Sequence, residues 1–284
     1  MRKYTLHWAL HPEKDQVWYE NECKRRTEDA VARELDINYA LSVSGKVFNP
    51  FKEHRHVTNS FAYNPSKPIY RIWDFGRTNA TLYAQIDSYH RKRILHERVL
   101  GAKGLVTDFD NASNTIEQLR VALSDSATLF PDAHFVDICD PSGSFEDHRG
   151  SRTEIEVLQE EGIFPMYDRI LSLPVRERKH RGRELILKDL QETPGGQEAF
   201  SIYVSPNGDA GCPTLKKAFQ GGYCYKKDAN GNLTDKIKEP NHPYEDVIDC
   251  LLYLYLETEG YAGVPTANYQ PIYSSDFVNP YTDM

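Results

Sequence analysis

The sequence predicts a mixed α/β fold, in which β-rich runs form one sheet and helices cover both of its faces. Three apolar, β-rich runs lie close together at 69–75, 80–87 and 92–99, and the short gap GRTN favours an antiparallel hairpin between the first two. A helical pattern over 114–130 then leads into a fourth strand over 133–140. Hairpin strands followed by a strand–helix–strand unit are typical of a mixed sheet between helices.

Length and composition are those of a folded protein with a large core. The 284 residues are 27% charged and 39% hydrophobic, and the formal net charge is −8. This charge argues against a protein that coats nucleic acid without sequence preference. It is compatible with a nuclease whose acidic metal site is offset by a local basic patch.

Cysteine use and the N-terminal residues predict a soluble intracellular protein. The five cysteines are widely spaced and form no CxxC pair, a pattern typical of reduced thiols. The first residues, MRKYTLHWALHPEK, lack the apolar core of a secretory signal. The run LLYLYL near the end is too short to span a bilayer. We therefore expect no membrane association.

The N-terminal region is predicted to be a helix followed by a linker. Residues 14–36 are rich in helix formers and charges and hold neither Gly nor Pro, which favours a solvent-facing helix. Residues 37–68 are rich in Ser, Asn, Pro and Gly, and we expect a linker with short extended pieces there.

The second half of the chain alternates short predicted elements with loops. These are a helix over 151–161, β-like runs at IFPMY, ELILK and FSIYVS, a helix near 211–220, a loop over 226–236 and an irregular tail over 260–284. The most apolar element is a helix over 243–257, in which Pro243 stands near the first turn.

Acidic residues stand at the ends of predicted elements. Asp74 ends the first strand, Asp140 ends the fourth, and Asp246 and Asp249 share one face of the last helix because they are three residues apart. If the first and fourth strands are parallel neighbours, both strand-end carboxylates project from one edge of the sheet. The start of the last helix could then bring its two carboxylates to the same point.

This set of carboxylates suits a hard divalent cation. Oxygen ligands without His or Cys fit Mg²⁺ or Mn²⁺ better than Zn²⁺. Carboxylates in contact repel one another, so a bound cation stabilises them. Two such ions can activate a water and stabilise the leaving oxygen in phosphodiester hydrolysis. The alternative is that each Asp is a turn or N-cap residue, as the Asp140–Pro141 pair would suit.

Five segments, taken in order, resemble the C-terminal nuclease domain of the large terminase subunit, the DNA-packaging motor of tailed bacteriophages. They are WYENE, ELDINYALSVSGKVF, WDFGRTNATLYAQID, DICDPSG, and LKKAFQGGYCYKKDANG followed by HPYEDVIDCLLYLY. The resemblance covers about residues 15–257. It implies an RNase H-like fold, with a five-stranded mixed sheet whose first three strands are antiparallel, flanking helices and an auxiliary β-hairpin.

The same resemblance implies the site residues. Asp74, Asp140 and Asp249 match the metal ligands of the family. Asp246 stands where many relatives have His; it could add a ligand, take over the role of that His or change the metal preference. Asp137 is the fallback for Asp140, since an odd separation puts the two on opposite faces of an ideal strand.

The implied organisation of the chain has three parts. Residues 1–66 match the end of the terminase ATPase or its connector, 67–260 the nuclease domain, and 261–284 an irregular tail. The sequence holds no GxxxxGK[ST] motif, because the only Gly-Lys pair, at 45–46, is followed by Val. We therefore expect no ATPase activity from this chain by itself.

A basic run, VRERKHRGR at 175–183, is the main candidate for contact with DNA phosphates. We expect a loop or hairpin there, and its candidate contact residues are Arg176, Arg178, Lys179, Arg181 and Arg183. The run HRKR at 90–93 and the pair Lys226 and Lys227 are weaker candidates, because most charge runs are only solvated faces. His134 and His242 are given no role, and Tyr253 and Tyr255 are expected in the core.

The expected function is a metal-dependent endonuclease, acting on double-stranded viral DNA during genome packaging with two Mg²⁺ or Mn²⁺ ions. Implied partners are the terminase ATPase domain, the portal protein and the small terminase subunit. The expected location is the host cytoplasm, transiently at the procapsid portal and not in the mature virion. Two alternatives stay open: another RNase H-like nuclease, specific for junctions or RNA–DNA hybrids, or a non-catalytic module that docks on the portal or ATPase.

Overall fold

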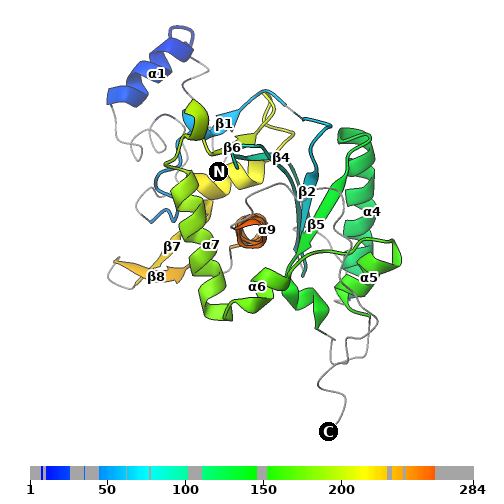
Figure 1. Ribbon diagram of the computed structural model, residues 1–284. Coiled ribbons are helices and arrows are strands. Elements are labelled where there is room, and N and C mark those ends of the chain that lie inside the picture. Colours follow the sequence, from blue (N-terminus) through cyan, green and yellow to red (C-terminus); the bar gives the residue numbers. More distant parts are fainter. Residues whose placement is uncertain are drawn as a thin grey trace, which may run out of the picture.

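The computed structural model is organised around one six-stranded sheet (Figure 1). It describes residues 8, 11–25, 35, 45–61, 63–76, 78–101, 111–145, 152–228, 232–238 and 241–259. The strands are β1 (Val57–Thr58), β2 (Ile69–Asp74), β3 (Asn79–Ile86), β4 (Lys92–Leu100), β5 (Phe135–Cys139) and β6 (Phe200–Tyr203). Their order in space is β1-β6-β4-β3-β2-β5.

The pairing directions are those of the predicted mixed sheet. Strand β3 pairs antiparallel with both β2 and β4, whereas β5 lies parallel to β2 and β6 lies parallel to β4. The mixed α/β fold of the RNase H-like type is therefore confirmed. The sixth strand comes from β1, a two-residue edge strand that pairs parallel with β6.

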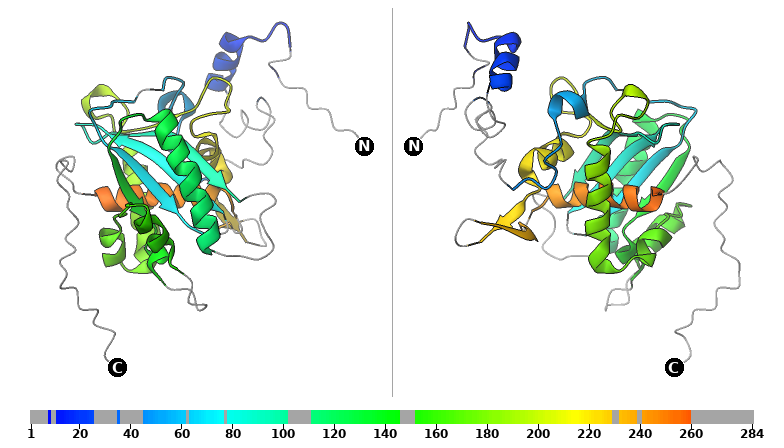
Figure 2. Two further views of the ribbon diagram at one scale, coloured as in Figure 1. Left: turned by 90° about the vertical axis from the view of Figure 1, so that its right-hand side faces the viewer. Right: turned by 60° about the vertical axis from the view of Figure 1, so that its left-hand side comes forward.

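Helices cover both faces of the sheet. Helix α9 (Tyr244–Thr258) packs on one face, with α7 (Val175–Asp189) crossing it, whereas α4 (Asn111–Leu129) covers the opposite face beside α5 (Glu154–Glu160), as Figure 2 shows. The other α-helices of the described residues are α1 (Gln16–Arg25), α3 (Glu53–His56), α6 (Asp168–Ser172) and α8 (Pro213–Lys217). A separate hairpin, β7 (Tyr225–Lys227) and β8 (Leu233–Ile237), lies beside α7.

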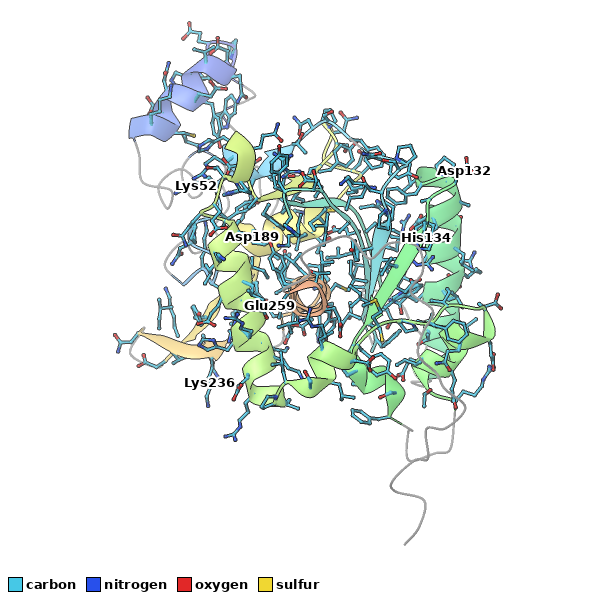
Figure 3. The ribbon with its side chains drawn as sticks, viewed as in Figure 1. Lys52, Asp132, His134, Asp189, Lys236 and Glu259 are labelled. Atoms are coloured by element: carbon cyan, nitrogen blue, oxygen red, sulfur yellow. The ribbon has the colours of Figure 1, made fainter. Side chains whose placement is uncertain are left out.

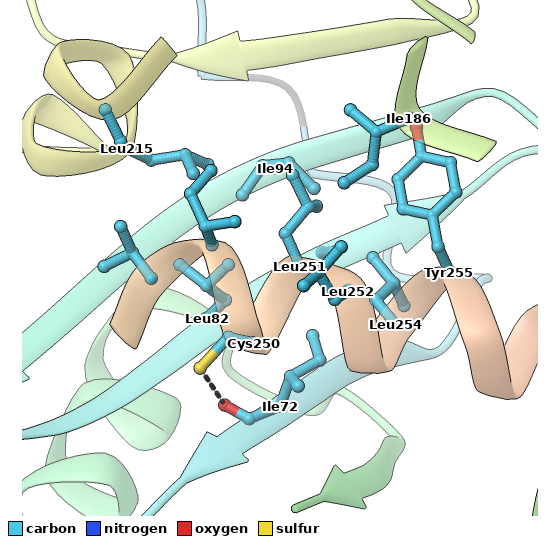
Figure 4. Close-up of a cluster of buried hydrophobic side chains, with 14 of the residues drawn as sticks. Ile72, Leu82, Ile94, Ile186, Leu215, Cys250, Leu251, Leu252, Leu254 and Tyr255 are labelled. Atoms are coloured by element: carbon cyan, nitrogen blue, oxygen red, sulfur yellow. Dashed lines mark hydrogen bonds between the residues drawn. The ribbon is translucent and has the colours of Figure 1, made fainter. Parts of the chain in front are cut away.

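Alternating strand side chains divide the core into two layers. Ile72, Leu82 and Ile94 pack with the buried face of α9, as the close-up in Figure 4 shows. Trp73 and Tyr83, one position further along their strands, face α4 instead; the Tyr83 hydroxyl donates to a carbonyl of that helix at 3.0 Å. Successive side chains of a strand point to opposite faces, and helices cover both faces of this sheet. Every residue of β2 and β3 is therefore buried.

Helix α9 is the most deeply buried helix of the described residues, and its sequence explains why. Its run VIDCLLYLYLE is apolar almost all round, so it can lie between the sheet on one side and α7 on the other. The Cys250 thiol donates to the Ala80 carbonyl at 3.4 Å, and it also contacts the carbonyl of Ile72 (Figure 4). Within the described part, no helix is long and apolar enough to cross a membrane.

The segment before the predicted nuclease domain packs into the same core. Val47, Phe48 and Phe51 are all buried, and Phe48 stacks on Tyr223 with ring centroids 6.0 Å apart. The expected linker therefore contributes side chains to the core and an edge strand to the sheet. The helix expected over 14–36 is seen as α1; most of 26–44 and the expected tail over 261–284 lie outside the described residues.

Three expectations about local structure are wrong. The basic run 175–183 is the first part of α7 and not a loop or hairpin, and ELILK continues that helix. Pro174 directly precedes a run of good helix formers, and Ile186 is fully buried on the face toward the core. The auxiliary hairpin forms instead over 225–237, where a loop was expected.

Candidate active site

Asp74 and Asp140 lie side by side at the ends of two parallel strands. Trp73 of β2 is in register with Cys139 of β5, and the Asp140 amide donates to the Trp73 carbonyl at 3.1 Å. Ile72, two residues before Asp74, faces α9, and the alternation of strand side chains brings both carboxylates to that same face. The parallel neighbours expected from the sequence are therefore present.

Asp137 lies on the other face of β5. Its carboxylate accepts two hydrogen bonds from the Arg71 guanidinium, at 2.6 and 3.1 Å, and a third from the Trp73 indole at 2.7 Å. Arg71 also donates to the Ser126 hydroxyl on α4 at 3.1 Å. Asp137 is thus a partner in a buried ion pair on the α4 side, away from the other aspartates.

The first turns of α9 bring the remaining two carboxylates to the same place. Asp246 and Asp249 line a cavity of about 850 Å³ together with Asp74 and Asp140. Three separate segments therefore contribute the four predicted acidic residues to one cavity. Its other lining residues include Phe75, Pro141, Phe145, Val175, Arg178 and Tyr253.

Burial raises the pKa values of Asp74, Asp246 and Asp249, and the charges of neighbouring carboxylates add to this effect. Asp74 is only 6% exposed; burial is the main reason that its pKa lies well above the usual range, and the charges of Asp249, Asp140 and Asp246 add to it. Burial likewise raises the pKa of Asp249 to about 6, although the nearby Lys179 ammonium opposes this. Ionisation of Asp74 and Asp249 therefore lowers the stability of the folded protein.

Basic residues of the chain itself engage the two carboxylates of α9. The Lys179 ammonium donates to Asp249 Oδ2 at 2.8 Å and to Glu245 Oε1 at 3.0 Å. His242 Nδ1 lies 2.9 and 3.0 Å from the two carboxylate oxygens of Asp246. These contacts explain how an acidic cavity is stable in a folded protein.

Hydroxyl and amide groups hold the two strand-end carboxylates. The Tyr253 hydroxyl donates to Asp74 Oδ1 at 3.3 Å, and the Ser142 amide donates to Asp140 Oδ1 at 3.0 Å. Asp140 thereby also caps the short helical turn Pro141–Ser144, so the N-cap interpretation and a place in the cavity apply to the same residue.

The donor set is chemically suited to a hard cation. As the side chains stand, no three His, Cys, Asp or Glu groups among the described residues are arranged so that they could hold a metal ion. One carboxylate oxygen, Asp249 Oδ1, is nevertheless buried without any hydrogen-bond partner. An unpaired buried carboxylate oxygen beside other carboxylates fits a divalent cation such as Mg²⁺ or Mn²⁺.

The five predicted DNA contacts share helix α7 but not one surface. Lys179 is engaged with Asp249, Arg181 pairs with Glu259, and Arg183 donates to the Lys179 carbonyl at 3.0 Å. Arg178 donates to the Leu173 carbonyl at 3.0 Å and lines the acidic cavity. In the described part of the chain, the Arg176 side chain makes no hydrogen bond or ion pair, and it is exposed.

The sequence analysis did not assign Glu245 to the site, expected Tyr253 in the core and gave His242 no role, yet all three line the cavity. Glu245 and Tyr253 stand four residues before and after Asp249, so helical spacing could have placed them on its face. His242 touches Asp246, four residues away. His134 precedes β5, whereas Asp140 follows it, so this histidine is at the far end of the strand (Figure 3).

Comparison with known proteins finds likeness in three-dimensional structure only. No protein-family model matches the chain, and no curated protein matches its sequence. The large terminase of a thermophilic bacteriophage, solved in complex with ADP, is 14% identical with a TM-score of 0.52, covering 87% of this chain and 53% of that one. The chain therefore spans about half the length of that large terminase.

Two nuclease domains match with lower TM-scores. The large terminase nuclease domain of P22 is 16% identical with a TM-score of 0.48, covering 75% of this chain and 92% of that domain. The SPP1 nuclease domain with bound Mn is 17% identical with a TM-score of 0.42, covering 72% and 96%. The chain shares its fold with part of the large terminase of the thermophilic bacteriophage.

Proposed function

We propose that the chain is a metal-dependent endonuclease that cuts double-stranded DNA during the packaging of a viral genome. The observation that carries this proposal is the meeting of Asp74, Asp140, Asp246 and Asp249 in one cavity at a sheet edge. The fold shared with part of the thermophilic phage large terminase supports it. The same acidic residues would be a liability in a protein that only provides a docking surface, because burial and the neighbouring carboxylates hold the pKa of Asp74 well above its usual range.

Asp74, Asp140 and Asp249 are the residues that would hold the cations, with Asp246 assisting. When bound, two divalent ions supply water activation and stabilisation of the leaving oxygen. Tyr253 orients the Asp74 carboxylate through its hydroxyl, and Ser142 does the same for Asp140 through its amide. We expect Mg²⁺ or Mn²⁺, because all four side chains offer hard oxygen donors.

The surroundings of the cavity support a nucleic-acid substrate. Arg178 and Lys179 line it from α7, and Arg176 is exposed on the first turn of that helix. These cations, with Arg181 and Arg183, would contact phosphates beside the cut, and phosphate contacts carry no sequence information. We therefore expect weak sequence preference.

The wider assignment extends the same proposal. The partners would be the ATPase domain of the packaging motor, the portal protein and the small terminase subunit. The place of action would be the host cytoplasm, at the portal of the procapsid. The chain would supply DNA cleavage to the motor and would leave ATP hydrolysis to the ATPase domain.

Plasmid cleavage tests the activity. Supercoiled DNA is incubated with wild-type protein in Mn²⁺, Mg²⁺ or EDTA, and in parallel with Asp74→Ala and with Asp132→Ala, an exposed aspartate outside the cavity. We expect cleavage by wild type and Asp132→Ala in Mn²⁺ or Mg²⁺, and none in EDTA or with Asp74→Ala. Cleavage that survives both EDTA and Asp74→Ala would refute the metal site.

The choice of substrate separates the two enzyme alternatives. Duplex DNA, an RNA–DNA hybrid and a four-way junction are compared at equal concentration. Faster cutting of the duplex supports a packaging nuclease, whereas activity confined to the hybrid or to the junction indicates another RNase H-like nuclease. Absence of cleavage on all three substrates would favour a docking module.

A further inference from the structure

Lys179 occupies an unusual position between two cavities. Its ammonium bonds Asp249 Oδ2 at 2.8 Å and Glu245 Oε1 at 3.0 Å, although about half of its side chain is exposed. Arg178 also lines the acidic cavity, but it donates to the Leu173 carbonyl, so of these two residues of α7 it is Lys179 that bonds to the cluster. A flexible ammonium at this place neutralises one carboxylate of α9 while its own stem stays in solvent.

The close approach of α7 to α9 explains why Lys179 reaches Asp249. Gly182 lies one turn after Lys179, and Leu252 lies one turn after Asp249, so the two pairs face each other across the helix contact. A Cβ atom on Gly182 would stand 2.7 Å from Leu252 Cδ2 and 3.2 Å from its Cβ. A side chain at position 182 would therefore require Leu252 to shift, and the glycine permits the helix spacing that sets the ammonium against the carboxylate.

Lys179 leaves the carboxylate cluster incompletely neutralised. It bonds one oxygen of Asp249, while the other, Oδ1, is buried without a partner. Asp74 and Asp140, the neighbouring carboxylates, are held by hydroxyl and amide donors that carry no positive charge. In this acidic site, the Lys179 ammonium is therefore bonded to one oxygen of Asp249, while the other oxygen has no hydrogen-bond partner.

We propose that Lys179 is the internal counter-ion of this site and that a divalent cation must displace its ammonium from Asp249 in order to bind. This inference rests on the proposed function, because it assumes that Asp249 is a ligand. The ammonium and the cation compete for the same carboxylate, so the lysine stabilises the metal-free protein and weakens metal binding.

The displaced ammonium has a place to go. A second cavity of about 300 Å³ adjoins the first, and both are lined by Lys179 and Glu245. Arg183 and the hairpin residues Lys226 and Lys236 line this second cavity, and Figure 3 shows Lys236 on the hairpin beside α7. Movement of Lys179 toward it would gather cations next to the acidic cavity, where a phosphodiester of the substrate carries negative charge.

Mn²⁺ binding, measured by calorimetry and electron paramagnetic resonance without DNA, tests the inference. The variants are Lys179→Met, Lys179→Arg and Lys188→Met. Lys188 is the matched control, because it is an exposed lysine on the same helix that pairs only with Glu192 among the described residues. We expect Lys179→Met to bind Mn²⁺ roughly fivefold more tightly than wild type, the factor that a half-exposed ion pair accounts for. The Mn²⁺ affinities of Lys188→Met and Lys179→Arg should stay within about twofold of the wild-type affinity.

Thermal unfolding gives a second readout that does not depend on binding constants. In EDTA, Lys179→Met should melt below Lys188→Met, and saturating Mn²⁺ should remove this difference. If Lys179→Met binds Mn²⁺ no more tightly than Lys188→Met, the counter-ion role is wrong. If wild type shows no Mn²⁺ binding that Asp74→Ala abolishes, the metal site itself fails, and the proposed function falls with it.

Discussion

At the scale of single residues, two aspartates at the end of β5 have opposite surroundings. Asp137 is bound on the α4 face by the Arg71 guanidinium and the Trp73 indole, with distances of 2.6 to 3.1 Å. Asp140 lines the cavity on the α9 face, where its neighbours are other carboxylates. Asp137 therefore stabilises the fold through its ion pair, whereas the charge of Asp140 contributes to the raised pKa of Asp74.

This difference predicts different phenotypes for two substitutions of equal chemistry. Asp137→Asn leaves the buried Arg71 charge without its partner and should lower the free energy of unfolding by about 3 kcal/mol. Asp140→Asn keeps the hydrogen bond from Ser142, so it should change the free energy of unfolding by less than about 1 kcal/mol. Urea unfolding and plasmid cleavage together check this prediction.

In the cleavage assay, the order of the two variants should be reversed: Asp140→Asn should be the more damaging change. The folded fraction of Asp137→Asn should retain activity, whereas Asp140→Asn should lose it while remaining folded. Loss of stability in Asp140→Asn comparable with that of Asp137→Asn would show that both aspartates are structural.

The raised pKa values predict a stability that falls with pH when metal is removed. The folded protein keeps protons on Asp74 and Asp249 after the unfolded chain has lost them, so raising the pH favours unfolding. The pKa of Asp249 is about 6. Most of the stability that this residue loses should therefore be lost as the pH rises from the ordinary pKa of a carboxyl group to about 7. Unfolding in urea with EDTA, repeated at several pH values, measures it.

Asp74→Asn is the variant that checks the origin of this pH dependence. The amide keeps an acceptor for the Tyr253 hydroxyl but removes a carboxylate that its neighbours repel. The free energy of unfolding of the variant should therefore exceed that of wild type by about 1–2 kcal/mol at pH 8 in EDTA. Its stability should also fall less steeply with pH. A variant that is less stable than wild type under these conditions would contradict the repulsion argument.

At the scale of elements, the contact between α7 and α9 determines the geometry of the cavity. Gly182→Val should crowd Leu252 and lower the free energy of unfolding by about 1–3 kcal/mol. The control is Lys188→Val on the same helix, which places the same β-branched residue at an exposed position and should cost about 0.5 kcal/mol or less. Equal effects of the two changes in urea unfolding would mean that the helices can move apart freely.

At the scale of the whole molecule, the segment 45–58 belongs to the core of the fold. Val47, Phe48 and Phe51 are buried, and β1 extends the sheet through β6. Burying each of these side chains contributes roughly 1.5–3 kcal/mol, so together they amount to much of the net stability, about 5–15 kcal/mol, that is typical of a domain.

Truncation at two positions tests this contribution. A chain that begins at 67, the start of the predicted nuclease domain, should melt well below the full chain or fail to fold. A chain that begins at 45 should melt within a few degrees of the full chain. Circular dichroism melting measures both, and equal melting temperatures would place the segment outside the cooperative unit.

The sequence by itself determined the mixed sheet and the positions of the four acidic residues. The three apolar runs at 69–75, 80–87 and 92–99, the short gap between the first two and the i, i+3 spacing of Asp246 and Asp249 are local patterns. Strands β2, β3 and β4 and helix α9 match them. Local patterns predict local structure because backbone hydrogen bonds and side-chain spacing act over a few residues.

Only the tertiary structure decided which charges meet. The helix over 175–189 was not predicted, because its run of charges lacks an obvious apolar stripe and only packing on α9 buries Gly182 and Ile186. The bond from Lys179 to Asp249 joins residues 70 positions apart, and no spacing rule reaches that far. The energy of a buried charge depends on its spatial neighbours, so long-range packing had to place Lys179 beside the cluster.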